Sequence, residues 1–111
     1  MVHPIAKGQT LLTKLILSKL QNNTEQYEIR RLMAGWGKAF FTSVAHCIVY
    51  HANEHGFPGR YLLYLRVASN FNKKRASKTE RKDGTTIWVR SNHEFLIEHN
   101  GLVIVYGRNK P

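Results

Sequence analysis

The sequence predicts a single α+β domain in which two or three N-terminal helices pack on a four-stranded antiparallel sheet. A chain of 111 residues is long enough for one modest core and too short for two. The first half repeats apolar residues with the period of a helix, and the second half is rich in aromatic and β-branched residues between turn signals. Gly56, Pro58 and Gly59 separate the two halves because these residues end helical structure. We therefore expect one domain over residues 1–111.

Three segments of the first half carry a helical pattern: 9–21, Thr24–Met33 and Phe40–His55. The apolar stripe of the first consists of Leu12, Leu15, Ile16 and Leu20. Asn22, Asn23 and Thr24 offer capping side chains to the second, whose first turn holds glutamates where the helix dipole favours them. Gly35 and Gly37 weaken the pattern after that. The sequence is compatible with two separate helices over Thr24–Met33 and Phe40–His55 and with one bent helix that spans both.

Four strands are predicted in the second half: Arg60–Ala68, Thr85–Arg90, Glu94–His99 and Leu102–Tyr106. The dipeptide Asn100-Gly101 joins the last two, and it is most favoured in two-residue turns in which both residues have positive φ. Such a turn would place Ile97 beside Ile104 and Phe95 beside Tyr106.

The charge of the chain indicates the class of its partner. Seventeen Lys and Arg residues against seven Asp and Glu residues leave a formal net charge of +10, which favours a polyanion such as nucleic acid. Cys47 is the single cysteine, so an intramolecular disulfide and zinc sites with two or more thiolates are excluded. With no targeting or membrane-spanning pattern, we expect an intracellular protein, cytoplasmic or nucleoid-associated.

A polar segment from Asn70 to Gly84 lies between the first two predicted strands and is too charged to be buried. We expect it to project as a hairpin. Within ten residues it holds six cations: Lys73, Lys74, Arg75, Lys78, Arg81 and Lys82. Such a density favours contact with phosphates, and the alternative is a solvated loop that keeps the protein soluble.

Helices followed by a strand, a basic hairpin tip and a second strand resemble the winged helix-turn-helix domain, over roughly residues 9 to 91. The resemblance implies a DNA-binding protein in which Thr24–Met33 is the support helix, Phe40–His55 the recognition helix and Lys73–Lys82 the tip of the wing. A recognition helix offers short polar side chains to base edges in the major groove. The residues that meet this demand are Thr42, Ser43, His46, Tyr50 and Asn53.

The last 25 residues or so also resemble the C-terminal strands of RelE/ParE-type toxins, small basic ribonucleases with helices against an antiparallel sheet. This second resemblance implies RNA cleavage without a metal, in which cations stabilise the phosphorane and His or Tyr moves protons. The groups available for it are Arg90, His93, His99, Tyr106 and Arg108.

His51 and His55, with Glu54 between them, match the His-x-x-Glu-His pattern of zinc peptidases. Gly56 and Pro58 end the helix at once, and no firm third ligand follows, so we expect two histidines that flank the core at a helix end. We therefore predict no metal and no cofactor. The expected partner is a nucleic acid, with DNA favoured over RNA, a homodimer as an open alternative, and no membrane.

Overall fold

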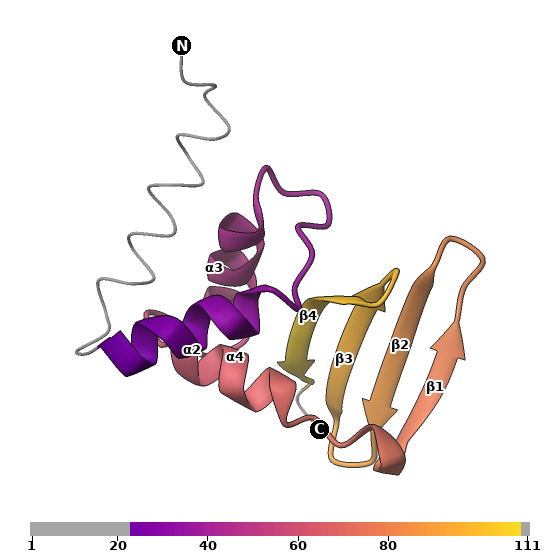
Figure 1. Cartoon of the computed structure of the whole chain (residues 1–111). Coiled ribbons are helices and arrows are strands. Elements are labelled where there is room, and N and C mark those ends of the chain that lie inside the picture. The colour runs from indigo at the N-terminus through magenta and orange to yellow at the C-terminus, as the bar shows by residue number, and fades with distance from the viewer. Residues whose placement is uncertain (1–22, 110–111) are drawn as a thin grey trace.

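The computed structural model describes residues 23–109, and within this range three helices precede a four-stranded antiparallel sheet (Figure 1). The predicted α+β class is thereby confirmed. The helices are α2 (Asn23–Met33), α3 (Val44–Glu54), α4 (Tyr61–Ser69) and the short 3-10 helix η1 (Lys73–Arg75). The strands are β1 (Ala76–Glu80), β2 (Thr85–Arg90), β3 (Glu94–His99) and β4 (Leu102–Arg108). The helix expected over 9–21 lies outside the described residues. Among residues 23–109, no helix is long and apolar enough to span a bilayer.

The helix α2 agrees with the predicted helix Thr24–Met33, and its Glu25 in the first turn and Arg30 and Arg31 in the last complement the helix dipole. The helix α3 begins four residues later than predicted. Residues 40–43 are irregular, and Ser43 caps the helix: its backbone is extended, and its hydroxyl accepts a 3.0 Å hydrogen bond from the backbone N–H of His46.

The segment Arg60–Ala68 was predicted as a strand, and this prediction is wrong because the segment forms α4. Its bulky residues recur with a helical period and place one face in the core: Tyr61, Leu62, Tyr64, Leu65 and Ala68 are buried. Leu63 and Arg66 lie on the exposed side. The aromatic content of this run suggested a strand, whereas the spacing of its apolar residues determines its structure.

The first strand instead comes from within the polar segment 70–84, which the sequence predicted to project as a hairpin. The strand β1 pairs with β2 from Ala76↔Arg90 to Glu80↔Thr86, and four of its five residues are exposed. An edge strand of this kind forms through backbone pairing and needs no apolar side chains. The turn that follows contains Gly84 at φ 89° and an Asp83 carboxylate that accepts a hydrogen bond from the N–H of Thr85 at 2.9 Å.

The strands follow one another in the order β1-β2-β3-β4, and the predicted Asn100-Gly101 turn is confirmed by φ values of 50° and 85°. The predicted pairings beyond it are wrong. Ile97 pairs with Val105, and Tyr106 pairs with Leu96, because a β-bulge shifts the register between Ile97 and Glu98. The bulge puts Tyr106 on the face that carries the buried Leu96.

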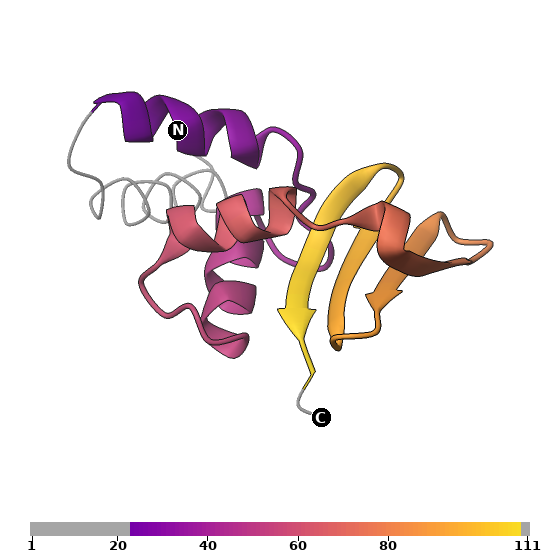
Figure 2. The ribbon, with the colours of Figure 1, turned by 90° about the horizontal axis from the view of Figure 1, so that it is seen from below.

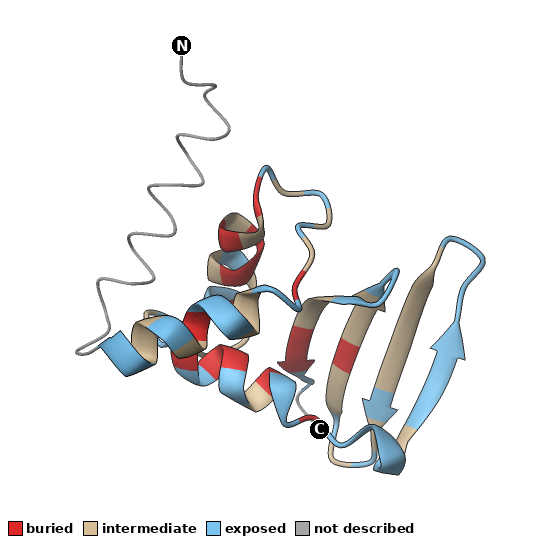
Figure 3. Cartoon of the chain, in the orientation of Figure 1, coloured by how far each residue is buried: buried red, intermediate tan, exposed pale blue. Residues whose placement is uncertain are grey.

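The helices lie beside the β4 end of the sheet rather than across its whole width (Figures 1 and 2). Figure 3 shows the buried residues concentrated where α2, α3 and α4 meet β3 and β4. The largest fully buried side chains are Tyr64, Ile29, Ile48, Leu65 and Cys47. The core therefore occupies one end of the molecule, and β1 and β2 extend away from it.

The outer edge of β4 is covered by groups from three parts of the helical half. Val103 exchanges backbone hydrogen bonds with Gly35 and Gly37 at 2.9 and 2.8 Å. The Cys47 thiol donates to the carbonyl of Ile104 at 3.3 Å, and burial raises the pKa of this thiol to about 12. These contacts attach the helices to the sheet through backbone groups that an edge strand would otherwise leave unpaired.

The third group at this edge is the Tyr64 hydroxyl. It donates to the Tyr106 carbonyl at 2.6 Å and accepts from the Tyr106 N–H at 3.0 Å. Burial holds the pKa of Tyr64 well above its usual range. A single buried hydroxyl thus satisfies both backbone groups of one strand residue.

Replacing Tyr64 by Phe should lower the free energy of unfolding by about 2–4 kcal/mol, because it leaves a buried N–H and a buried carbonyl without partners. Urea denaturation measures this loss. The matched control is Tyr61→Phe on the same helix, since Tyr61 is also buried but its hydroxyl makes no hydrogen bond to the described residues. Equal losses in the two variants would contradict the role assigned to Tyr64.

Candidate nucleic-acid interface

The six cations of the predicted basic loop are spread along a rigid hairpin rather than gathered in one solvated loop. Lys73, Lys74 and Arg75 form η1, Lys78 lies in the middle of β1, and Arg81 and Lys82 occupy the turn before β2. At about 3.3 Å per strand residue, the five residues of β1 separate η1 from the turn by about 17 Å. The expectation of a projecting hairpin is confirmed, and the expectation of a single loop from Asn70 to Gly84 is wrong.

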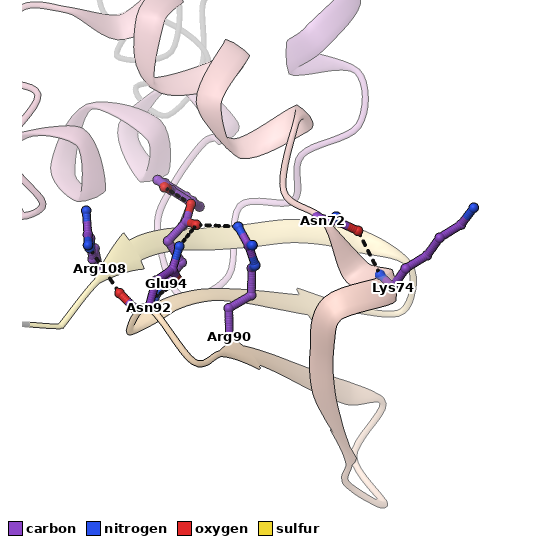
Figure 4. Close-up of polar contacts among 7 residues, drawn as sticks. Asn72, Lys74, Arg90, Asn92, Glu94 and Arg108 are labelled. Carbon is purple, nitrogen blue, oxygen red and sulfur yellow. Dashed lines mark hydrogen bonds and ion pairs between the residues drawn. The ribbon is translucent and has the colours of Figure 1, made fainter.

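Side chains fix the start of this hairpin. Asn72 caps η1, and its side-chain oxygen accepts a hydrogen bond from the N–H of Lys74 at 3.1 Å (Figure 4). Phe71, directly before it, is buried in the core. Backbone and core contacts therefore orient η1, so that its cations start from a fixed position.

Two of the six cations are held over Trp88 of β2. The ammonium groups of Lys73 and Lys78 lie 5.1 and 5.2 Å from the centre of an indole ring of Trp88. Glu98 accepts from the indole N–H and from Lys73, both at 2.8 Å, while Glu80 pairs with Lys78 at 2.8 Å. These contacts neutralise both lysines locally and make them the weaker candidates for phosphate contact.

The other four cations have no ion pair among the described residues. Lys74 and Arg75 at η1, and Arg81 and Lys82 at the turn, are all exposed. Of the nearby acids, Glu98 pairs with Lys73, Glu80 with Lys78 and Glu94 with Arg90. Asp83 lies in the same turn as Arg81 and Lys82; the hydrogen bond from the Thr85 N–H, with a smaller contribution from the charge of Arg81, lowers the pKa of its carboxyl. A surplus of positive charge therefore lies at both ends of the hairpin.

A second polar cluster surrounds Glu94 at the end of the sheet near η1 (Figure 4). Its carboxylate accepts from Arg90 at 2.8 Å, from Asn92 at 2.6 Å and from the hydroxyl of Tyr106 at 2.6 Å. These bonds, that of Tyr106 first, lower the pKa of Glu94. Arg108 lies beside it and donates to the carbonyl of Asn92 at 3.0 Å. Sequence reasoning missed Glu94 and Asn92, since three different strand ends bring this cluster together.

This geometry divides the residues of the ribonuclease alternative. Arg90, Tyr106 and Arg108 gather around Glu94, and the exposed His93 lies in the adjoining turn. His99 lies at the opposite end of β3, about 17 Å away at 3.3 Å per residue, and its ring donates to the Asp83 carbonyl at 2.9 Å. The Tyr106 hydroxyl is committed to Glu94, and burial, followed by that bond, raises its pKa above the usual range.

Only some of the residues that the sequence predicted to contact bases from α3 are free to do so. Ser43 was predicted on the outer face, but it is 2% exposed and serves as the N-cap. The Thr42 hydroxyl lies 3.3 Å from a ring nitrogen of His46, whose ring packs against Phe41 at 5.0 Å between centroids. Asn53 is exposed near the C-terminal end of the helix.

The structure also separates α3 from the basic hairpin. The helix α3 lies beside β4, while β1 is the opposite edge of the sheet (Figures 1 and 2). The helix that leads into the hairpin is α4, and its inner face is buried in the core. The two predicted DNA-contacting surfaces therefore do not form one continuous surface. No protein-family model, curated protein or solved structure matches the chain.

His51 and His55 belong to an aromatic cluster. Their rings stack at 6.0 Å, and His55 packs edge-on against Phe95 at 5.5 Å. Among residues 23–109, no three His, Cys, Asp or Glu side chains form a group that could hold a metal ion. Burial lowers the pKa of both histidines, and the neighbouring His55 lowers that of His51 further. Both shifts favour the neutral form of the rings.

These two histidines should make the protein less stable in mild acid. Their pKa values are lower in the folded chain than the ordinary value of 6.5, so the unfolded chain binds protons more readily. The stabilisation is present above about pH 6.5 and is lost as the pH falls below it. Chemical denaturation at pH 7 and pH 5 should give the lower free energy of unfolding at pH 5.

The control for this measurement is His93→Gln, which changes an exposed histidine of a turn and should keep the same pH dependence. The double variant His51→Gln and His55→Gln should lose most of it. A wild type that is equally stable at both pH values would contradict the assignment.

Proposed function

We propose that this protein binds nucleic acid, and duplex DNA in preference to RNA, through the phosphate contacts of its β1–β2 hairpin. The observation that carries the proposal is the set of four exposed cations without an ion pair among residues 23–109: Lys74, Arg75, Arg81 and Lys82. The formal charge of +10 adds a general attraction for polyanions. The role requires a compartment that contains DNA, such as the cytoplasm and nucleoid.

The dimensions of the hairpin fit this ligand. Its two cationic ends are separated by about 17 Å of strand, and phosphates along one strand of B-DNA advance about 3.4 Å per nucleotide along the axis. The two ends would therefore contact phosphates about five nucleotides apart. Because β1 is rigid and paired with β2, little conformational entropy is lost when both ends bind.

Phosphate contacts position a protein on DNA but do not read its sequence. The helix α3 lies at the other edge of the sheet, so its exposed Asn53 is outside the footprint of the hairpin. We therefore propose a binder with little base specificity. The preference for duplex DNA rests on the winged-helix resemblance of the helix–hairpin order, with α4 in place of α3 as the helix that precedes the hairpin.

The proposal predicts that two pairs of cations with the same charge differ in their effect on binding. Changing Lys74 and Arg75 together to Ala should reduce the salt slope of the logarithm of the association constant by about two units, near 0.9 for each lost phosphate contact. Changing Lys73 and Lys78 to Ala removes the same charge, but these lysines are held over Trp88, so the slope should fall by less than about one unit. Fluorescence anisotropy with a labelled DNA duplex at several salt concentrations measures both slopes.

Asn53→Ala serves as a further control and should leave affinity and slope unchanged. Equal slopes for wild type and the variant of Lys74 and Arg75 would remove the hairpin as the contact surface. Parallel samples with single-stranded RNA and EDTA test the alternative chemistry. Cleavage of that RNA, abolished by Arg108→Ala, would overturn the proposal in favour of a metal-independent ribonuclease.

A further inference from the structure

The two faces of the sheet differ sharply in charge. Alternate residues of a strand point to opposite faces, and residues paired across strands share a face. One face carries all six charged side chains of the four strands: Lys78, Glu80, Arg90, Glu94, Glu98 and Arg108. It also carries Leu96 and Tyr106, which join the core.

The opposite side, here called the apolar sheet face, consists of Ile87, Val89, Phe95, Ile97 and Val105. The other positions on this side of the strands hold Ser77, Thr79, Thr85, His99, Leu102 and Gly107, and none holds Asp, Glu, Lys or Arg. Val89 is 42% exposed, and the other four are half-buried. Such a face on a chain of net charge +10 is unusual for a surface that meets only water.

No described helix lies over the middle of this sheet, because α2, α3 and α4 gather beside β4 (Figures 1 and 2). His55 reaches only the margin of the apolar sheet face, where its ring contacts Phe95. A β-carbon added at Gly107 would lie 2.6 Å from the His55 ring and 2.7 Å from Phe95, so glycine allows this close packing. At the end of β2 and β3 next to the Asn100-Gly101 turn, the loop residues Ala39 and Phe40 line a pocket with Thr85 and His99. Val89, at the other end of this side, remains 42% exposed among the described residues.

We propose that a second copy of this chain covers the apolar sheet face, so that two sheets pack face to face in a two-fold dimer. A partner recognised through its charge would need opposite charges here, and the apolar sheet face has none. Its own copy fits, because a two-fold contact joins identical surfaces, and an uncharged apolar surface is complementary to itself. The charged side chains of both chains point away from the contact, which limits repulsion between two copies of net charge +10.

The size of the face sets the strength of the dimer. Four strands at about 4.8 Å spacing and six residues at about 3.3 Å give a plan area of about 400 Å². A standard interface buries about 800 Å² on each partner. The dimer is therefore weak and concentration-dependent, with a dissociation constant in the micromolar range or above. It leaves the charged face of each sheet, with Lys78, on the outside of the assembly.

Sedimentation equilibrium of the full chain over a wide range of concentrations tests this proposal. Wild type should pass from monomer to dimer as the concentration rises. Val89→Glu and Val89→Arg should each weaken association by about tenfold or more, because either charge must lose its hydration in the contact. The matched control is Leu63→Glu on α4, which introduces the same charge at an apolar side chain that is 41% exposed, and it should associate like wild type.

Thr79→Glu, on the same side at the exposed edge strand β1, is a second test that places no strain on the fold and should also weaken the dimer. Circular dichroism confirms that each variant is folded. A wild type that stays monomeric at all concentrations overturns the proposal, and a large loss of stability in Val89→Glu would then indicate a segment of the same chain as the occupant. Opposite effects of Val89→Glu and Val89→Arg would indicate a charged partner and also overturn it.

Discussion

The outer edge of β4 is the constraint on which the arrangement of the molecule depends. An edge strand exposes a row of unpaired N–H and carbonyl groups, and burying it against helices leaves these groups without water. Here a loop, a thiol and the Tyr64 hydroxyl supply the missing partners. Since all three come from the helical half, the helices are attached beside the sheet and not across it. The half of the sheet furthest from them consequently has no helix of residues 23–109 packed across it.

The distribution of charge on the sheet follows from the position of the helices beside β4. The acidic residues of β1 and β3 pair with cations on the same face of the sheet, and Glu98 joins Lys73 to the indole of Trp88. Four cations of the hairpin, Lys74, Arg75, Arg81 and Lys82, have no ion pair among residues 23–109 and lie at its two ends. The protein thus combines a neutral, apolar surface on one side of the sheet with a cationic edge strand, and these suit two different kinds of partner.

The parts of the fold that depend on local sequence could be predicted, and those that depend on distant contacts could not. Asn100-Gly101 defines its turn without help from the rest of the chain. The strand β1 has no apolar signal, because pairing with β2 forms it, and α4 was misread because its tyrosines and leucines suit a strand as well as a buried helix. The six cations of the hairpin could be identified from the sequence because they lie within ten residues. Which of them are held over Trp88 depends on Glu98, two strands away from β1, and no local pattern reveals this.

The β-bulge of β4 has a consequence for how the chain can change in length. One extra residue between the turn and Tyr106 shifts the alternation of side chains, so the second half of the strand presents its residues to the opposite faces from those an unbulged pairing would give. Deleting Ile104 would remove the bulge but keep every pairing from Val105 onward, so Tyr106 would still face the core. A loss of one residue at any point between Glu94 and His99 would instead exchange the faces of the side chains beyond it. Related sequences should therefore tolerate the loss of one residue at the bulge of β4 better than a loss within the regular strand β3.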